Sequence, residues 1–418
     1  MRVMVLNNGS SSVKFDLIDL SGTNGPPSAR TLAHGQIDLL GHEATLPAGA
    51  SPEAGRGTLR RSAGARDREQ AIGQAIDAIS EVVIPGTGST GAPVQAVGHR
   101  VVHGGDRFVA PVLVDDSVLS ALEGLEELAP LHNPAAVEGI RVAREALGPE
   151  VPMVAVFDTA FHATMPEHAY TYALPHDMAQ RKPDVKQSLR RYGFHGTAHE
   201  YMLKRYSESL GIPTYEATII TLQLGNGCSA TAIRDGRSVD TSMGFTPLEG
   251  LVMGTRSGDI DPSIVGYLVR KEGISAEEVE HLLNERSGLL GISGRSADMR
   301  DLLAAAPHDP QAQLAIDIFC YRARKYIGAY LAAMGGAQAI VFGGGIGENA
   351  PAIRAGICEG LEWCGLRLDA PRNAATVGAE GRISVDEAPI AAHVVTVNEA
   401  ILIAMHTAEC IRLSSAGP

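Results

Sequence analysis

Residues 3–19 read VMVLNNGSSSVKFDLID, and this stretch decides the fold that the sequence predicts. An apolar run is followed by a turn with asparagine and glycine, and then by a second run in which apolar and polar residues alternate. This pattern is typical of a β-hairpin. Residues 220–236, ITLQLGNGCSATAIRDG, show the same arrangement. We interpret the two hairpins as copies from a duplication, which predicts two related domains that face each other across a cleft.

Glycine-rich turns recur at three places in the chain: NNGSSS at 7–12, LGNGCS at 224–229 and FGGGIGENAP at 342–351. Successive backbone N–H groups in such turns form an anion-binding concavity, and glycine lets a phosphate oxygen approach closely. An arginine segment, GTRSGDIDP at 254–262, lies between the second turn and the third. Together these segments indicate a nucleotide and a transferable phosphoryl group.

Length and composition indicate two ordinary α/β domains. The chain has 418 residues, of which 44% are hydrophobic and 20% charged, and this length exceeds the size at which one core stops growing. The formal net charge of −13 argues against a nucleic-acid partner, whose phosphates would repel it. Neither a secretory leader nor a membrane-spanning run is recognisable. Five cysteines without CxxC spacing favour reduced thiols, so we expect a cytoplasmic protein.

Strand and helix patterns alternate along most of the chain, which favours largely parallel pairing. Little periodicity is seen over 21–70, where we expect loops and peripheral strands. The third glycine turn is expected to be a loop between a buried strand and a helix. The other predicted strands lie within 94–105, 151–158, 218–242 and 339–342, and the predicted helices lie at 67–83, in two stretches between 118 and 147, and at 262–271, 276–284, 311–334 and 351–361.

Several nucleotide-binding folds are excluded by missing motifs. The chain has no GxxxxGK[ST] P-loop and no protein-kinase HRD or DFG motif. The third turn lacks the acidic residue that follows a dinucleotide-binding glycine motif about 20 positions later. A duplicated strand-turn-strand phosphate clamp instead resembles the superfamily of acetate and sugar kinases, heat-shock 70 proteins and actin. That resemblance implies duplicated ribonuclease H-like, or actin-like ATPase, domains.

At the level of individual motifs, the chain resembles the acetate kinase (acetokinase) family from one end to the other. The resemblance implies Mg²⁺-dependent, reversible, in-line transfer of the ATP γ-phosphoryl group to acetate, giving acetyl phosphate and ADP, with Mn²⁺ as an alternative metal. It also implies a homodimer, a domain I of 1–160 plus 396–418, and a nucleotide-binding domain II of 161–395. The matching motifs are NNGSSSVKF, GHRVVHGG, LAPLHNP, FDTAFH, YGFHGTAH, LGNGCS, SMGFTPLEGLVMGTRSGDIDP, SGLLGISGRSADMRD, FGGGIGEN and VNEA.

The proposed reaction needs positive charge more than it needs a base. A carboxylic acid titrates near pH ~4, so the acceptor is already ionised at neutral pH. Two anions must meet, and the charge on the phosphoryl group in flight must be stabilised by positioned donors and metal. Arg100 and Arg256 lie in glycine-flanked segments, and a guanidinium binds carboxylate or phosphate bidentately. By resemblance, Arg100 holds the acyl substrate and Arg256 the migrating phosphoryl group.

Three histidines and one aspartate are further candidates. By resemblance, His195 stabilises the transition state, His132 lines the acyl site and His199 has no such role; from spacing alone, His195 and His199 are either metal ligands or ordinary helix residues. Asp158 follows a buried strand, where α/β proteins place chemistry, although an N-cap is the simpler interpretation. By resemblance it is the active-site aspartate. We favour positioning over proton transfer, because the nucleophile already lacks its proton.

The metal, acyl and nucleotide sites are assigned by resemblance. Mg²⁺ keeps several waters, so one or two protein ligands suffice, and the matching pair is Asn7 and Glu399. Since these lie at opposite ends of the chain, the C-terminal segment is expected to return to the first domain. The acyl pocket would use Val102, Leu131, Phe194 and Pro247. The nucleotide and its phosphates would lie along Ser10, Ser12, Lys14, Gln223, Leu224, Gly225, Asn226, Gly227, Asp298, Met299, Arg300, Gly345, Ile346, Gly347, Glu348 and Asn349.

The chain departs from the family pattern at a few positions. Gln223 stands where the family has histidine in HLGNG, FGGG replaces a Thr-Ala-Gly run, and NEA replaces NEE. These changes leave open a different nucleoside triphosphate or pyrophosphate as donor. Propionate or butyrate as acceptor is equally open, and a sugar or glycerol kinase is disfavoured because no hydroxyl-activating aspartate motif stands out. A nonenzymatic nucleotide switch of the actin or chaperone type is the alternative from another class.

Overall fold

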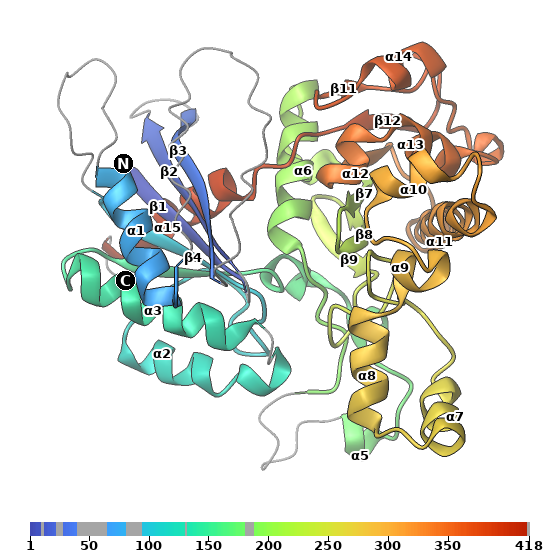
Figure 1. Cartoon of the computed structure of the whole chain (residues 1–418). Helices are drawn as coiled ribbons and strands as arrows, with labels where there is room; N and C mark the ends of the chain where they lie inside the picture. The colour runs from blue at the N-terminus through green and yellow to red at the C-terminus, as the bar shows by residue number, and fades with distance from the viewer. Residues whose placement is uncertain are drawn as a thin grey trace. The chain divides into compact units, whose positions relative to one another are not determined.

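The computed structural model describes residues 1–9, 12–21, 28–39, 65–80, 94–129, 132–179 and 188–415. They form two compact units, here called unit 1 (Met1–Ala160 with Asn398–Pro418) and unit 2 (Phe161–Val397) (Figure 1). Each unit contains one six-stranded sheet, and helices connect the parallel strands. The predicted α/β class is therefore confirmed.

The sheet of unit 1 has the strand order β3-β2-β1-β4-β6-β5. The first three strands form an antiparallel meander, β4 and β6 continue parallel to β1, and β5 is an antiparallel edge. The strands are β1 Arg2–Asn8, β2 Ser12–Ser21, β3 Ser28–Asp38, β4 Ala96–Val101, β5 Val112–Leu113 and β6 Met153–Phe157. The helices are α1 Arg68–Ser80, α2 Asp116–Glu123, η1 Glu126–Leu128, α3 Asn133–Leu147 and α15 Glu399–Ser415, with η2 Ala160–Thr164 at the border of the two units.

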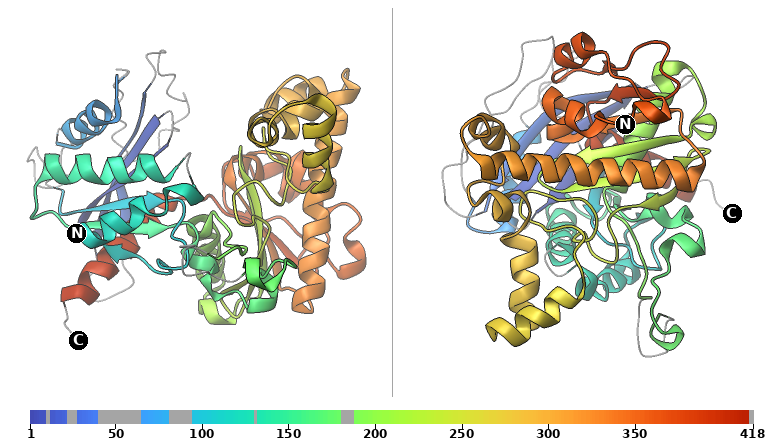
Figure 2. Two further views of the ribbon diagram at one scale, coloured as in Figure 1. Left: turned by 90° about the horizontal axis from the view of Figure 1, so that it is seen from below. Right: turned by 90° about the vertical axis from the view of Figure 1, so that its right-hand side faces the viewer.

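Two helical layers cover the sheet of unit 1. On one face, Val3 and Val5 of β1 pack with Ile403 of the C-terminal helix α15. The opposite face carries α1 and α3, and Gly139 of α3 lies so close to Asn8 of β1 that a Cβ there would clash. Figure 2, left, shows α3 and α15 on opposite sides of the sheet. The end of the chain thus completes the core of the unit that contains its beginning.

The sheet of unit 2 has the strand order β11-β12-β10-β7-β8-β9. Its strands are β7 Ile219–Leu224, β8 Cys228–Arg234, β9 Arg237–Thr241, β10 Ala339–Gly343, β11 Gly381–Arg382 and β12 Ala391–Val394. Its helices are α4 Glu167–Tyr170, α5 His176–Ala179, α6 Gly196–Leu210, η3 Thr214–Glu216, α7 Ser263–Glu272, α8 Ala276–Glu285, α9 Gly288–Ser293, α10 Met299–Ala305, α11 Pro310–Met334, α12 Gly344–Asn349, α13 Pro351–Cys358, η4 Glu362–Cys364 and α14 Ala370–Ala375.

Different helices cover the two faces of this second sheet. Met202 and Tyr206 of α6 pack on Ile219 and Val341, which line one face. The other face is covered by the long helix α11, where Arg234 of β8 donates a hydrogen bond to the carbonyl of Ala333, 3.1 Å away. Figure 2, right, shows α11 lying across the strands. Asp309 caps α11 by accepting from two backbone N–H groups, and its C-cap Gly335 is left-handed, as expected for helix ends.

The two sheets are copies of one plan, which confirms the duplication. Strand by strand, β1, β2, β3, β4, β6 and β5 correspond in order and direction to β7, β8, β9, β10, β12 and β11. Even the register shift recurs: it lies between Leu17 and Ile18 in the first copy and between Ala232 and Ile233 in the second. A shared irregularity of this kind is a stronger sign of common descent than the turn sequences, since bulges are conserved within families.

Some local predictions were wrong. The third glycine turn is not a loop, because residues 344–349 form the short helix α12, and the Glu348 carboxylate accepts from the N–H of Gly344 at 3.0 Å. In the second hairpin, neither Asn226 nor Gly227 has the positive φ of a two-residue Asn-Gly turn. Most of 21–70 lies outside the described residues, but the peripheral strand expected there is present as β3, an edge strand of eleven residues.

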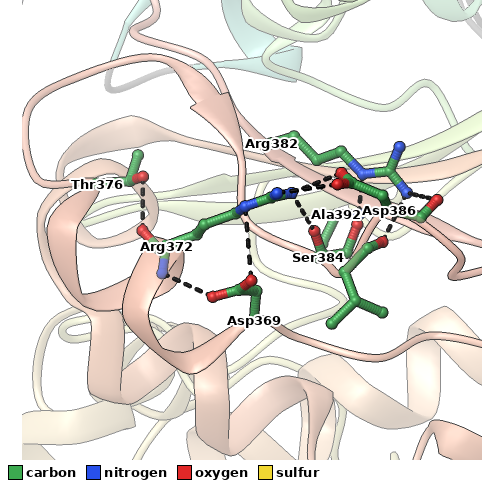
Figure 3. A network of polar contacts seen from close by, with 8 residues as sticks. Asp369, Arg372, Thr376, Arg382, Ser384, Asp386 and Ala392 are labelled. Atoms are coloured by element: carbon green, nitrogen blue, oxygen red, sulfur yellow. Dashed lines mark hydrogen bonds and ion pairs between the residues drawn. The ribbon is translucent and has the colours of Figure 1, made fainter.

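A polar network ties helix α14 to the strands at the edge of the second sheet (Figure 3). Arg372 of α14 lies between Asp369 and Asp386 and donates to the Asp386 carboxylate at 2.6 and 3.0 Å. Arg382 of β11 donates to the Ser384 hydroxyl at 3.0 Å and to the Val385 carbonyl at 2.7 Å. Exposed ion pairs add little stability, so the main consequence is geometric: α14 is held at a fixed place.

His99 of β4 is fully buried, and we expect it to make folding sensitive to acid. Burial lowers the pKa of His99 to about 3, whereas a histidine in the unfolded chain titrates near pH ~6.5. Below that pH the unfolded chain binds a proton that the folded chain does not, so stability falls as the pH drops. His99→Leu should therefore show a smaller loss of Tm between pH 7.5 and 5.0 than the parent. Equal losses would contradict this, and the exposed His308 provides the control substitution.

Several negative observations apply to the described residues alone. There, no helix is both long enough and apolar enough to cross a bilayer. Within the same ranges, no group of three or more His, Cys, Asp or Glu side chains could hold a metal ion. The five cysteines are free thiols, as the sequence indicated.

Candidate active site

In unit 1 the alternation of side chains along the strands gathers polar residues at one corner of the sheet. Residues 3 and 5 of β1 face α15, so residue 7 has the same orientation. Lys14 is its partner across the β1–β2 pair. By the same alternation, Arg100 of β4 and Asp158 after β6 share the face of Ala96, Val154 and Val156, which also pack against α15. The first residue of α15 is Glu399. The strands and α15 therefore bring Asn7, Lys14, Arg100, Asp158 and Glu399 to the corner of the sheet where the parallel strands β1, β4 and β6 end.

Arg100 is held between two carboxylates. Its Nε lies 2.9 Å from Oδ1 of Asp158 and its Nη2 lies 2.7 Å from Oδ2, so the pair is bidentate. On the other side, Nη1 of Arg100 lies 3.4 Å from Oε2 of Glu399. The Asp158 side chain is only 1% exposed, against 16% for Arg100 and 22% for Glu399. The exposed part of the group is thus the guanidinium edge and Glu399, with Asp158 behind them.

The charges in this corner depend on one another. Burial opposes the charge of Arg100, yet the carboxylates of Asp158 and Glu399 raise its pKa above the ordinary value. Burial also raises the pKa of Glu399, and the charge of Asp158 adds to that rise, whereas Arg100 and Lys14 oppose it. Arg100 is therefore a permanently charged group in a fixed orientation, and Glu399 is a carboxylate whose ionised form a further cation would favour.

The other residues predicted for this half of the site are less informative. Ser10 and Leu131 lie outside the described residues. Ser12 is the first residue of β2, and Val102 follows the end of β4; both residues are half-buried. His132 is the N-cap residue of α3, and its side chain makes no capping hydrogen bond.

In unit 2 the second glycine turn approaches both a histidine and an arginine. A Cβ on Gly227 would lie 2.9 Å from Nη2 of Arg256 and 3.4 Å from Nε2 of His195. A side chain at this position would crowd both residues, so glycine keeps the backbone of the turn close to them. Asn226 of the same turn accepts from the N–H of Gly254 at 2.9 Å, which joins the turn to the arginine segment. The predicted phosphate-binding turn and the predicted phosphoryl-binding arginine are therefore neighbours.

Arg256 is half-buried and has no acidic partner among the described residues. Its Nη1 donates to the carbonyl of Pro247 at 2.6 Å, and among the described residues no carboxylate lies within ion-pair distance. Partial burial lowers the pKa of this guanidinium, although the groups of Cys228 and Glu285 oppose the shift. A partly desolvated cation whose charge is not neutralised is a natural place for an anion. Its backbone is fixed against the left-handed Gly288 at the start of α9.

His195 has an unusual backbone. Its φ is +57°, in the left-handed region that a residue with a side chain rarely adopts, and it is the N-cap of α6. Its Nδ1 lies 2.9 Å from the hydroxyl oxygen of Ser229 on β8. Strained conformations of this kind persist where the surroundings fix them, and they cluster at functional sites. The neighbouring Phe194 is almost fully buried.

The third glycine segment is braced by side chains that the sequence did not single out. Arg354 of α13 is fully buried and donates to the carbonyls of Gly347 and Thr376 at 2.8 and 2.6 Å. It also donates to the side chain and the carbonyl of Asn373, at 2.8 and 2.7 Å, which joins α12 to the fixed helix α14. The Glu348 carboxylate accepts from the N–H groups of Gly344 and Val397, each at 3.0 Å. Glu348, predicted to touch the nucleotide, thus holds the segment itself.

The second predicted nucleotide segment, Asp298 to Arg300, begins helix α10. Asp298 is the N-cap and accepts from the N–H of Arg300 at 2.8 Å. The Arg300 side chain is 90% exposed and pairs with the same carboxylate, while Met299 is buried. The side chain of Arg300 is the part of this segment that is accessible to a ligand.

Arg191 is a further residue that the sequence did not single out. Its guanidinium donates to the carbonyls of Thr241 and Ser242 at 2.8 and 3.0 Å and pairs with Glu249 at 2.5 Å. The hydroxyl of Tyr172 also binds Glu249 and accepts from the N–H of Phe245 at 2.9 Å. This network supports the beginning of the segment that carries Arg256. Its contacts join residues that are 50 or more positions apart in sequence, so no local signal could reveal them.

Comparisons with known proteins agree with this geometry. A model of the acetokinase family matches residues 2–405. Acetate kinase of Chloroherpeton thalassium is 49% identical, over 98% of this chain and 99% of that protein. The crystal structure of Porphyromonas gingivalis acetate kinase is similar with a TM-score of 0.85 and 38% identity, covering 98% of this chain and 99% of that one. A propionate kinase from Francisella tularensis follows with a TM-score of 0.79 and 37% identity, at the same coverage. The chain belongs to the acetokinase family, a family of phosphotransferases that phosphorylate acetate with ATP.

Proposed function

We propose that this chain transfers the γ-phosphoryl group of ATP directly to acetate, and that Arg256, His195 and the glycine turn at Gly227 stabilise the group in flight. The observation that carries the proposal is that a half-buried guanidinium without a carboxylate partner and an imidazole both approach that turn. Positioned donors aimed at developing charge are the largest single contribution in phosphoryl transfer. Since acetate is ionised at neutral pH, no base is required.

Arg100 would bind the acetate carboxylate, with Asp158 fixing the direction of the guanidinium. The bidentate pair leaves Nη1 of Arg100 as the group nearest Glu399. The proposed acyl contacts remain His132, Val102, Leu131, Phe194 and Pro247. An apolar pocket distinguishes acetate from propionate by roughly 1–3 kcal/mol per methylene. The solved structure named propionate kinase is 37% identical to this chain, against 38% for the Porphyromonas gingivalis acetate kinase, so propionate is a second acceptor to test.

Magnesium would be held by Glu399 and Asn7. The chemistry of the donor set fits, because a carboxylate and an amide oxygen are hard ligands and both residues belong to the polar corner of unit 1. Bound Mg²⁺ would neutralise charge on the β- and γ-phosphates, and Mn²⁺ has the same ligand preference. Lys14 and the serines of the first turn would contact phosphate oxygens. The nucleotide would lie along 223–227, 298–300 and 345–349.

Trapping the product with hydroxylamine tests the function directly. Purified protein with ATP and Mg²⁺ should give a hydroxamate with acetate, and parallel reactions with propionate and butyrate would rank the acceptors. The signal should disappear in Arg256→Ala. Slow ATP hydrolysis without hydroxamate from any of the acids would instead support a nucleotide switch. The expected homodimer is tested separately by light scattering of the eluted protein.

Gln223→His is expected to raise kcat/KM about tenfold. Gln223 is the penultimate residue of β7 and pairs in register with Gly343, and its Oε1 is buried without a hydrogen-bond partner among the described residues. A charged imidazole would donate a stronger hydrogen bond than an amide to nearby phosphate, by about 1.4 kcal/mol. Steady-state kinetics with Gln223→Ala as the reference would measure this. An unchanged kcat/KM in Gln223→His would show that the position does not contact the transferring group.

A further inference from the structure

One face of the sheet in unit 2 carries hydroxyl groups where α6 begins. Thr221 of β7 and Ser229 of β8 are fully buried and share the face on which α6 packs. Elsewhere on that face the contacts with α6 are apolar. Buried hydroxyls are costly unless they are hydrogen-bonded. The hydroxyls of Thr221 and Ser229 therefore need hydrogen-bond partners, and α6 provides them.

His199 of α6 satisfies both hydroxyls. Its Nδ1 lies 2.7 Å from Oγ1 of Thr221, and its Nε2 lies 2.8 Å from Oγ of Ser229. The same Ser229 oxygen lies 2.9 Å from Nδ1 of His195, one helical turn earlier. A continuous chain of hydrogen bonds thus runs from Thr221 through His199 and Ser229 to His195.

The protonation of His199 restricts the direction of this chain. Burial lowers the pKa of His199 well below its ordinary value, and the nearby His162 and His195 lower it further. A neutral imidazole has one donor and one acceptor nitrogen, so one of the two hydroxyls donates to His199 and the other accepts from it. When Thr221 donates to His199, Ser229 accepts from Nε2 of His199 and has its own hydroxyl proton available for Nδ1 of His195, which places the proton of a neutral His195 ring on Nε2. In the reverse direction, Ser229 accepts from Nδ1 of His195.

Whichever of Ser229 and His195 is the donor, the hydrogen bond between the Ser229 hydroxyl and Nδ1 of His195 orients the His195 ring. A ring held at Nδ1 has its Nε2 on the far side, and that atom lies 3.4 Å from where a Cβ on Gly227 would be. Arg256 approaches the same point. The backbone of His195 is in the left-handed region, so the helix geometry alone does not provide this orientation.

We propose that Ser229 and His199 are positioning residues, which hold the His195 ring with Nε2 toward the Gly227 turn. The proposal rests on the proposed role of His195 in phosphoryl transfer. His199, to which the sequence comparison gave no role, acts through Ser229 and does not touch the substrate. An oriented donor stabilises charge that appears only in the transition state, so the positioning residues affect kcat more than KM.

The test compares two serines that have the same burial and the same kind of histidine contact. Ser229 and Ser238 are both fully buried, and each lies 2.9 Å from the Nδ1 of a histidine, which is His195 for Ser229 and His162 for Ser238. Ser229→Ala should lower kcat about tenfold or more, with the KM values for ATP and acetate changed less than twofold. Ser238→Ala should leave kcat within twofold of the parent. If the two variants lose a similar amount in Tm, a larger loss of kcat in Ser229→Ala reflects function and not folding.

A double-mutant cycle with His195→Ala shows whether Ser229 acts through His195. The tenfold effect of Ser229→Ala should shrink to less than twofold when His195 is already alanine. A full effect in that background, or equal kcat losses in Ser229→Ala and Ser238→Ala, would overturn the positioning role while leaving the role of His195 intact. If His195→Ala itself keeps the parent kcat, both roles are wrong. A His199→Gln variant, whose amide can still donate to Ser229, should retain more activity than His199→Leu.

Discussion

Replacing Arg256 by alanine is expected to lower kcat by about 10³-fold or more. An arginine that stabilises a transferring phosphoryl group contributes on the order of 10³ to 10⁵ in rate. Arg256 has the features that this role requires, since it is half-buried, is bound to the carbonyl of Pro247, and lies outside ion-pair distance of any carboxylate in the described part of the chain. Steady-state kcat and KM for ATP, measured at saturating acetate, check the prediction.

Two further variants make the Arg256 result interpretable. Arg256→Lys keeps the charge but loses the planar fork, so it should recover only part of the activity. Arg234→Ala is the control, because this exposed arginine also donates to a main-chain carbonyl in unit 2, that of Ala333. The control should keep parental kinetics. An Arg256→Ala enzyme that lost less than tenfold in kcat would show that the transferring group is stabilised elsewhere.

The sequence predicts the framework of both units well, for physical reasons that are local. The two hairpins follow from alternation with a period of two, and both are present as β1–β2 and β7–β8. The long helix predicted at 311–334 is Pro310–Met334, and its ends are set by Asp309 and the left-handed Gly335. Each of these signals acts within a few residues. Because the two units are duplicated, the pattern recognised in one unit also applies to the strand order of the other.

The glycine segment at 342–351 shows where such local reasoning fails. Glycine has a low helix propensity, so a loop was the reasonable prediction. The segment is nevertheless helical, because Glu348 accepts from the first N–H of α12 and Arg354 gathers the carbonyls at its end. The Val397 N–H that completes the bracing of Glu348 is 49 residues away. Contacts between residues so far apart in sequence override the low helix propensity of glycine, and no local sequence pattern reveals them.

For the candidate site, sequence reasoning predicts which residue types lie at strand ends but not how they pair. Arg100 and Asp158 were singled out separately, as an arginine in a glycine-flanked segment and as an acid after a buried strand. Their bidentate contact joins residues 58 positions apart, and it follows from parallel β4 and β6 lying side by side. The participation of Glu399 requires the return of α15 to the same sheet, which only the motif resemblance suggested.

Replacing Asp158 by alanine is expected to lower kcat/KM for acetate by about 10²- to 10³-fold, and Arg100→Ala should do the same. Removing one partner of a buried, hydrogen-bonded charge pair costs roughly 3–5 kcal/mol, much of it because the other charge is left unpaired. If Asp158 acts by orienting Arg100, the double variant should be no worse than Arg100→Ala. The kcat/KM values of the four proteins in this cycle, measured on the folded fraction of each, check the prediction.

Asp158→Asn then separates positioning from proton transfer. An amide oxygen still accepts the Arg100 hydrogen bond that Oδ1 now accepts at 2.9 Å, but an amide does not titrate. A positioning aspartate therefore predicts that asparagine retains at least tenfold more activity than alanine. An aspartate that moves a proton predicts equal losses in Asp158→Asn and Asp158→Ala, and effects that multiply with Arg100→Ala, because general acid–base catalysis is worth roughly 10² to 10⁴ by itself. Since a carboxylate acceptor has no proton to lose, the first pattern is the expected one.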